Sequence, residues 1–106
     1  MKKLNLIVPT VVHEDINEII FYKKSLGSYK SNIDKLVQEI YKMFDHLVES
    51  PKIGRDLSSR VDVSTTLRYL VVQDYLIFYE IDGRNLLVIR ILSAKSNWKR
   101  TLFRND

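Results

Sequence analysis

The chain has 106 residues, of which 45% are hydrophobic and 28% charged, and its formal net charge is +4. This length and composition are typical of one soluble globular domain with a single core, and they exclude a disordered chain. The sequence contains no cysteine, which excludes disulfides, thiolate metal sites and cysteine nucleophiles. We therefore expect one domain over residues 1–106.

The positive charge lies in the second half of the chain. Residues 1–50 hold seven lysines and seven carboxylates, whereas residues 51–106 hold ten Lys or Arg and six carboxylates. Between Gly83 and Asn105 there are six cations and no carboxylate. This asymmetry favours an anionic partner, either nucleic acid or an acidic protein segment. The alternative is a solvated basic surface without a specific partner.

The N-terminal segment does not resemble a signal peptide, because its apolar run is short and Pro9 interrupts it. No apolar stretch approaches the roughly 20 residues that a membrane-spanning helix needs. We expect a cytoplasmic protein without a membrane partner.

The first predicted elements are a strand and a helix. Alternating apolar residues predict a short strand over residues 4–8, which Pro9 ends. Helical spacing starts at Thr10 or His13 and stops at Gly27, a glycine suited to a left-handed cap. Three carboxylates in the early turns are expected to interact with the helix dipole: Glu14, Asp15 and Glu18.

The second helix has the clearest pattern in the chain. An apolar stripe runs from Ile33 to Val48, and the helix should end by Ser50-Pro51. Ser28 or Ser31 can cap its start. The short connection predicts an antiparallel hairpin of two helices.

The second half predicts a loop and three strands. Residues 51–62 are polar, residues 65–72 are rich in β-branched and aromatic side chains, and a hairpin of residues 75–81 and 86–92 turns through Asp82-Gly83. The order strand-helix-helix-strand-strand-strand predicts an α+β fold, with a mostly antiparallel sheet and the α-helical hairpin packed on one face.

A period of two assigns the strand residues to faces. Leu87, Ile89 and Ile91 form an all-apolar set that is expected beneath the helices. Arg90 then belongs to the open face, which is also the simpler placement for Arg68, because arginine is seldom buried without a partner.

No phosphate loop, zinc-protease, hydrolase or calcium-binding motif occurs in the sequence. His13 and His46 are too few and too far apart to predict a metal site, and we expect no cofactor. The side chains that could bind a partner or act on a substrate are therefore those of arginine, lysine and aromatic residues. Trp98 can either stack on a base or form, with Leu102 and Phe103, the apolar stripe of a short helix docked on the body.

Four segments together resemble the RelE/ParE superfamily of type II toxin–antitoxin toxins. They read PKIGRDL at 51–57, LRYLVV at 67–72, YLIFY at 75–79 and VIRIL at 88–92. The helical hairpin before them also fits, so that the resemblance covers nearly the whole chain. It implies the RelE/ParE toxin fold and a growth-inhibiting toxin, of the kind involved in plasmid stabilisation, that is neutralised by a cognate antitoxin in a hetero-oligomer.

The resemblance leaves two modes of action open. Members that cleave mRNA on the ribosome usually carry an arginine where this chain has Leu76, and polar groups after the last strand and in the tail. The nearest positions here are Ser93, Lys95 and Ser96, then Leu102 or Phe103. These departures favour the ParE branch, which inhibits DNA gyrase without catalysis. An mRNA endoribonuclease is the alternative.

The site residues expected from the resemblance are basic. If the protein is an RNase, the catalytic candidates are Arg68, Arg90 and Lys95. The binding surface for target or antitoxin is expected at Arg68, Arg90, Lys95, Trp98, Lys99 and Arg100.

Overall fold

The computed structural model describes residues 3–103. Arg104, one of the six cations between Gly83 and Asn105, lies outside the described residues. The elements along the chain are β1 (Asn5–Ile7), α1 (Thr10–Ser25), α2 (Lys30–Glu49), β2 (Arg55–Asp56), a 3-10 turn (Leu57–Ser59), β3 (Arg68–Val72), β4 (Tyr75–Asp82), β5 (Asn85–Ser93) and α3 (Trp98–Leu102). The predicted order is confirmed, β2 and the 3-10 turn are added to it, and α3 corresponds to the short final helix that was one of the two readings of Trp98.

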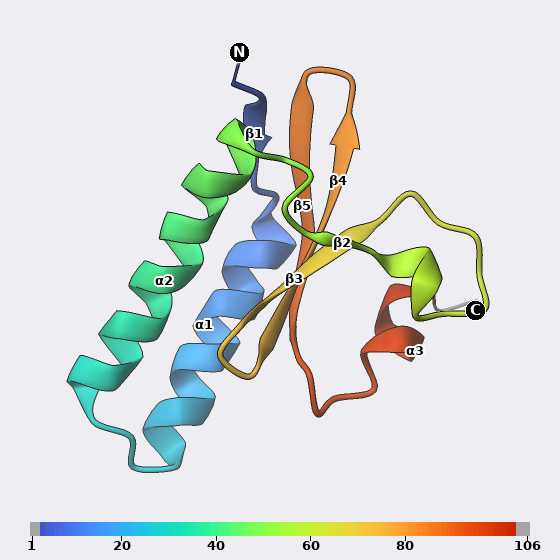
Figure 1. The fold of residues 1–106 in the computed structure, drawn as a ribbon. Coiled ribbons are helices and arrows are strands. Elements are labelled where there is room, and N and C mark those ends of the chain that lie inside the picture. The colour runs from blue at the N-terminus through green and yellow to red at the C-terminus, as the bar shows by residue number, and fades with distance from the viewer. Residues whose placement is uncertain (1–2, 104–106) are drawn as a thin grey trace.

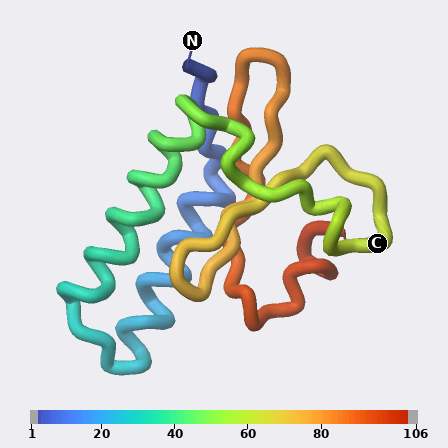
Figure 2. Tube along the Cα trace, in the orientation of Figure 1, coloured from blue at the N-terminus to red at the C-terminus, as the bar shows by residue number. Residues whose placement is uncertain are grey.

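The five strands form one sheet in the order β1-β5-β4-β3-β2. β1 runs parallel to β5, and all other neighbours are antiparallel. The two long helices lie side by side along one side of the sheet, and α3 lies on the other side (Figure 1). The chain trace shows the α1–α2 turn and the β4–β5 turn at opposite ends of the molecule (Figure 2). The fold is the expected α+β fold.

Some of the predicted helix ends are confirmed, and one predicted cap is wrong. Gly27 has φ +78° and its N–H donates to the Lys24 carbonyl, so that the predicted left-handed cap of α1 is confirmed. The predicted serine cap of α2 is wrong: Tyr29 is the N-cap residue, and its carbonyl accepts from Asn32 and Ile33 without any side-chain bond. α2 ends at Glu49, as Ser50-Pro51 predicted.

The main core lies between the helices and the sheet. Buried side chains of the predicted α2 stripe pack against side chains of α1 and against strand side chains that face the helices. The core comprises Val12, Ile16, Ile19, Leu36, Ile40, Phe44, Leu47, Val72, Tyr75, Ile77, Tyr79, Leu86, Val88 and Ile91. Of the aromatic residues of this stripe, Phe44 is buried in the core, whereas Tyr41 is 43% exposed and makes an edge-to-face contact with Phe44.

A second apolar cluster covers the other face of the sheet. It contains Leu57, Tyr69, Leu76, Phe78 and Trp98, with Leu102 and Phe103 at its margin. The Trp98 ring lies 5.3 Å from that of Phe78, and Trp98 is only 7% exposed. Of the two readings of Trp98, the docked short helix is confirmed, because a buried indole has no free face for a base.

A β-bulge overturns the predicted faces of β5. Phe78 pairs with Arg90 but Tyr79 pairs with Val88, which leaves Ile89 as an extra residue. The extra residue shifts the alternation, so that Leu86, Val88 and Ile91 face the helices while Ile89 packs in the second cluster. The predicted all-apolar face of Leu87, Ile89 and Ile91 is wrong for this reason.

Within residues 3–103, no helix is both long enough and apolar enough to span a bilayer.

Candidate functional site

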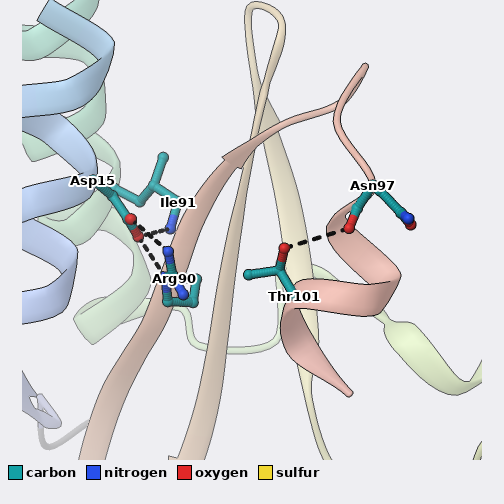
Figure 3. Close-up of polar contacts among 5 residues, drawn as sticks. All are labelled: Asp15, Arg90, Ile91, Asn97 and Thr101. Carbon is teal, nitrogen blue, oxygen red and sulfur yellow. Dashed lines mark hydrogen bonds and ion pairs between the residues drawn. The ribbon is translucent and has the colours of Figure 1, made fainter. Parts of the chain in front are cut away.

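An ion pair joins β5 to α1 at the bulge. The Nε and Nη2 atoms of Arg90 each donate to the Asp15 carboxylate over 2.8 Å, and the Ile91 backbone N–H donates to the same group over 3.0 Å (Figure 3). Both side chains are largely covered, with 29% of Arg90 and 10% of Asp15 exposed. Asp15 thus neutralises a cation and satisfies a backbone amide on the strand edge that β1 leaves uncovered.

Arg90 lies at the outer edge of β5. It pairs with Phe78, whose side chain faces α3, while its guanidinium reaches the Asp15 carboxylate on α1. Its hydrogen bonds to Asp15 raise the pKa of the guanidinium, against the opposing effect of burial, and the nearby Glu14 and Glu18 act in the same direction. The register agrees with the predicted strand face of Arg90, but the guanidinium is not free there, because a carboxylate on α1 provides the partner that a covered arginine requires.

Arg68 also points to the helix side and holds the loop after α2. It shares a face of β3 with Leu70 and Val72, which pack toward the helices. Its Nη2 donates to the carbonyls of Gly54, at 2.7 Å, and of Lys52, at 3.3 Å. The expected open-face placement of Arg68 is therefore wrong.

Tyr79 completes this loop anchor. Its hydroxyl donates to the Pro51 carbonyl over 2.6 Å and accepts from the Gly54 N–H over 3.0 Å. A Cβ on Gly54 would overlap the Tyr79 hydroxyl and lie 2.8 Å from the Tyr69 carbonyl. The glycine of the PKIGRDL segment is needed for this close approach.

The remaining expected residues are spread over the end of the chain. Lys95, Lys99 and Arg100 are exposed, and the Lys99 ammonium lies 5.7 Å from the centre of the buried Trp98 ring. Arg60, which sequence reasoning did not single out, lies 5.8 Å from the same ring and 5.4 Å from that of Tyr69. Two cations thus flank the second cluster at its rim.

Two of the expected residues meet at one concavity, which we call the edge groove. It has a volume of about 640 Å³ and runs between α1, the outer edge of β5 and the segment before α3. Arg90 and Lys95 line it, whereas Arg68 lies beyond β4 and does not. The other lining residues are Asp15, Glu18, Ile19, Tyr22, Lys23, Leu26, Asp74, Tyr75, Ile91, Leu92, Ser93, Ser96 and Thr101.

The edge groove follows an unpaired strand edge. β1 pairs with β5 only from Asn85 to Leu87, so that no strand in the described residues covers the outer side of β5 beyond that point. The groove carries as many cations (Lys23, Arg90, Lys95) as carboxylates (Asp15, Glu18, Asp74). Such a site suits an extended peptide of mixed charge, which can add to the edge through backbone hydrogen bonds.

No group of three or more His, Asp or Glu residues that could hold a metal ion occurs between residues 3 and 103. His13 and His46 are exposed on different helices.

Comparison with known protein families shows to which family the chain belongs. The family model described as "ParE toxin of type II toxin-antitoxin system, parDE" matches residues 12–98, from the first core residue of α1 to Trp98. The chain belongs to the ParE toxin family. As a ParE-family member it is a type II toxin of the RelE/ParE superfamily, which confirms the resemblance seen in the sequence.

A solved structure supports the fold of this ParE-family chain. The structure described as the chromosomal ParDE TA system from P. aeruginosa matches with a TM-score of 0.70 at 18% identity, over 86% of this chain and 96% of that one. Among curated proteins, none matches significantly.

Sequence reasoning missed Asp15, the partner of Arg90. It assigned the early carboxylates of α1 to the helix dipole, but α1 begins at Thr10 and its first turn contains no acidic residue. A usable signal was present, because Asp15 lies beside Val12, Ile16 and Ile19 on the buried side of the helix. A carboxylate at such a position requires a partner from another element.

Proposed function

We propose that this protein is the growth-arresting toxin of a toxin–antitoxin pair, that it inhibits DNA gyrase without a catalytic centre of its own, and that a cognate antitoxin neutralises it. Membership of the ParE family is the basis for this proposal. The alternative is cleavage of mRNA on the ribosome.

The positions and bonding partners of Arg68, Arg90 and Lys95 are the observation that favours the non-enzymatic mode. Arg90 is bound to Asp15, and Arg68 is bound to two backbone carbonyls of the loop after α2. Lys95 is exposed, on the other side of β4 from Arg68. Leu76 stands where the mRNA-cleaving members usually carry an arginine, and it is buried in the second cluster. These residues do not converge on one point where a phosphate could react.

The mode of action can be tested with purified protein. We expect it to inhibit supercoiling by DNA gyrase without ribosomes, and to leave a defined message uncut when ribosomes are added. Lys95→Ala provides the matched control, because an RNase would lose cleavage with this exposed substitution while its stability stayed unchanged. Message cleavage that needs Lys95 would establish the RNase alternative instead.

The antitoxin is proposed to occupy the edge groove. Apart from the Ile91 amide, which is bound to Asp15, the outer edge of β5 beyond Leu87 offers backbone groups to an extended segment, and Tyr22 and Leu92 offer apolar contacts beside it. Lys95, Lys99 and Arg100 lie next to this segment and suit acidic residues of the partner. Arg68, which the sequence also suggested for this surface, lies beyond β4 and is not part of the proposed site.

Calorimetry with the antitoxin, which we expect to be encoded next to this toxin, tests this surface. Tyr22→Ala and Lys95→Glu should each weaken antitoxin binding at least tenfold, a difference of about 1.4 kcal/mol. Ile53→Ala, a matched change at an exposed residue of the loop after α2, should have no effect. Equal affinities for all three variants would rule out the edge groove as the antitoxin site.

A further inference from the structure

The turn between α1 and α2 carries a second exposed surface, the hairpin tip, which we define as Phe21, Lys24, Tyr29 and Lys30. Phe21 is 75% exposed and Tyr29 78%. Phe21 and Tyr29 have the highest exposed fractions among the large apolar side chains of the described residues. The tip forms the lower end of the molecule in Figure 1, far from the β4–β5 turn.

Neither the fold nor the helices require these aromatic residues. α1 buries Val12, Asp15, Ile16 and Ile19, and α2 buries a stripe that starts at Ile33, so the tip residues lie outside both core faces. Solvent-exposed Phe and Tyr close together in the sequence are typical of protein-binding surfaces, in which aromatic side chains supply the central contacts.

The charge at the tip has a single sign. Between Glu18 and Asp34 the sequence contains three lysines and no carboxylate. Lys30 pairs with Asp34 over 2.9 Å, and the Lys23 ammonium lies 5.6 Å from the centre of the Tyr75 ring, which leaves Lys24 as the most available cation. This pattern complements an acidic partner surface.

The tip and the edge groove therefore suit different partners. The groove balances three cations against three carboxylates, whereas the tip carries cations and exposed aromatic side chains only. Nucleic acid is the weaker candidate for the tip, because the affinity of a phosphate backbone depends on many free cations and gains little from exposed apolar side chains outside a stacking groove. A protein surface can bind both the cations and the exposed aromatic side chains.

We infer that the hairpin tip is the surface through which this toxin contacts its target protein, at an apolar pocket rimmed by carboxylates, while the antitoxin binds elsewhere. This inference rests on the proposed function as a toxin. It adds that target and antitoxin contacts are separable by substitution.

The double variant Phe21→Ala/Tyr29→Ala tests the inference. We expect at least a tenfold rise in the concentration that inhibits gyrase supercoiling, loss of growth arrest in cells, and antitoxin affinity within twofold of the wild type. The control is Ile53→Ala/Val63→Ala, which removes two exposed apolar side chains elsewhere on the surface, 52% and 49% exposed. Circular dichroism confirms that each variant is folded.

Substitutions that change or keep the charge of Lys24 provide a second, independent test. Lys24→Glu should weaken gyrase inhibition several-fold and Lys24→Arg should preserve it, because the partner surface is expected to be acidic. Equally strong inhibition and growth arrest by the aromatic double variant and the wild type would overturn the inference. So would loss of antitoxin affinity with unchanged toxicity, or tight, salt-sensitive binding of the isolated toxin to duplex DNA that depends on Phe21 and Tyr29.

The two proposals fail in distinguishable ways. If the wild type arrests growth but does not inhibit gyrase, the gyrase mode is wrong, and the growth assay still decides whether the tip is needed. If the wild type neither arrests growth nor inhibits gyrase, both proposals are wrong.

Discussion

Single polar residues hold the long helices and the loop after them to the sheet. Asp15 binds a guanidinium and a backbone amide from β5, while Arg68 and the Tyr79 hydroxyl bind backbone groups of the loop that starts at Pro51. Each is a partly or fully buried polar group whose partner comes from a distant part of the chain. Loss of one partner leaves the other without a hydrogen bond, which costs more than the bond itself contributes.

Asp15→Ala tests this principle at the bulge. We expect the free energy of unfolding to fall by about 2–3 kcal/mol, because Arg90 and the Ile91 amide both lose their partner. Urea unfolding measures the change. Asp34→Ala, which removes an exposed i,i+4 pair with Lys30, is the control and should cost at most about 0.5 kcal/mol. Similar losses for both variants would contradict the assigned role of Asp15.

Tyr75 is expected to make stability depend on pH in the alkaline range. Burial, followed by the charge of Asp74, raises the pKa of its hydroxyl above the ordinary 10.0. The folded state therefore holds the proton more tightly, so this contribution is complete below pH 10 and is lost as the pH rises through the folded-state pKa. Urea unfolding from pH 9 to 11 should show a steeper decline for the wild type than for Tyr75→Phe. Parallel declines would show that the hydroxyl is not involved.

At the scale of elements, β4 and α3 explain how so small a chain covers both faces of its sheet. Tyr75, Ile77 and Tyr79 of β4 face the helices, while Leu76 and Phe78 face α3 and the 3-10 turn. α3 has only five residues and is too short to be stable alone, so that its position depends on the burial of Trp98.

Trp98→Ala should therefore release α3 and expose Phe78. We expect a loss of about 3–5 kcal/mol in the free energy of unfolding, as for other large aromatic residues removed from a core. Lys99→Ala, which removes only a cation beside the ring, should cost about 0.5–1 kcal/mol. Hydrogen exchange should show faster exchange across residues 98–103 in the first variant only. Unchanged exchange there would mean that Trp98 does not hold α3.

At the scale of the whole molecule, the two apolar clusters share β4 as their common wall. A strand buried on both faces cannot lose one cluster without weakening the other. The domain should therefore unfold as one cooperative unit despite its two cores.

Two spectroscopic signals separate the clusters and test this cooperativity. Trp98, the only tryptophan, reports on the second cluster by its fluorescence, and circular dichroism at 222 nm reports mainly on α1 and α2. We expect the two urea transitions to coincide within error. A fluorescence transition at clearly lower urea would show that the second cluster unfolds independently.

The two long helices, the β4–β5 hairpin and the family could be predicted from the sequence, because each depends on local periodicity, turn residues or the order of short segments. α2 ends where Pro51 requires, and Gly27 and Gly83 adopt the positive φ that their turns need. The parallel pairing of β1 with β5 and the two-residue strand β2 were beyond such signals, since they depend on contacts between distant segments.

The direction in which the charged site residues point depends on tertiary packing. One extra residue at Ile89 reverses the face of part of β5, and no local pattern in the sequence marks it. Arg90 and Arg68 find their partners 75 and 14 residues away, so their burial follows from how the helices and the loop meet the sheet. Periodicity describes a regular strand, whereas bulges and long-range polar pairs are fixed by packing in three dimensions.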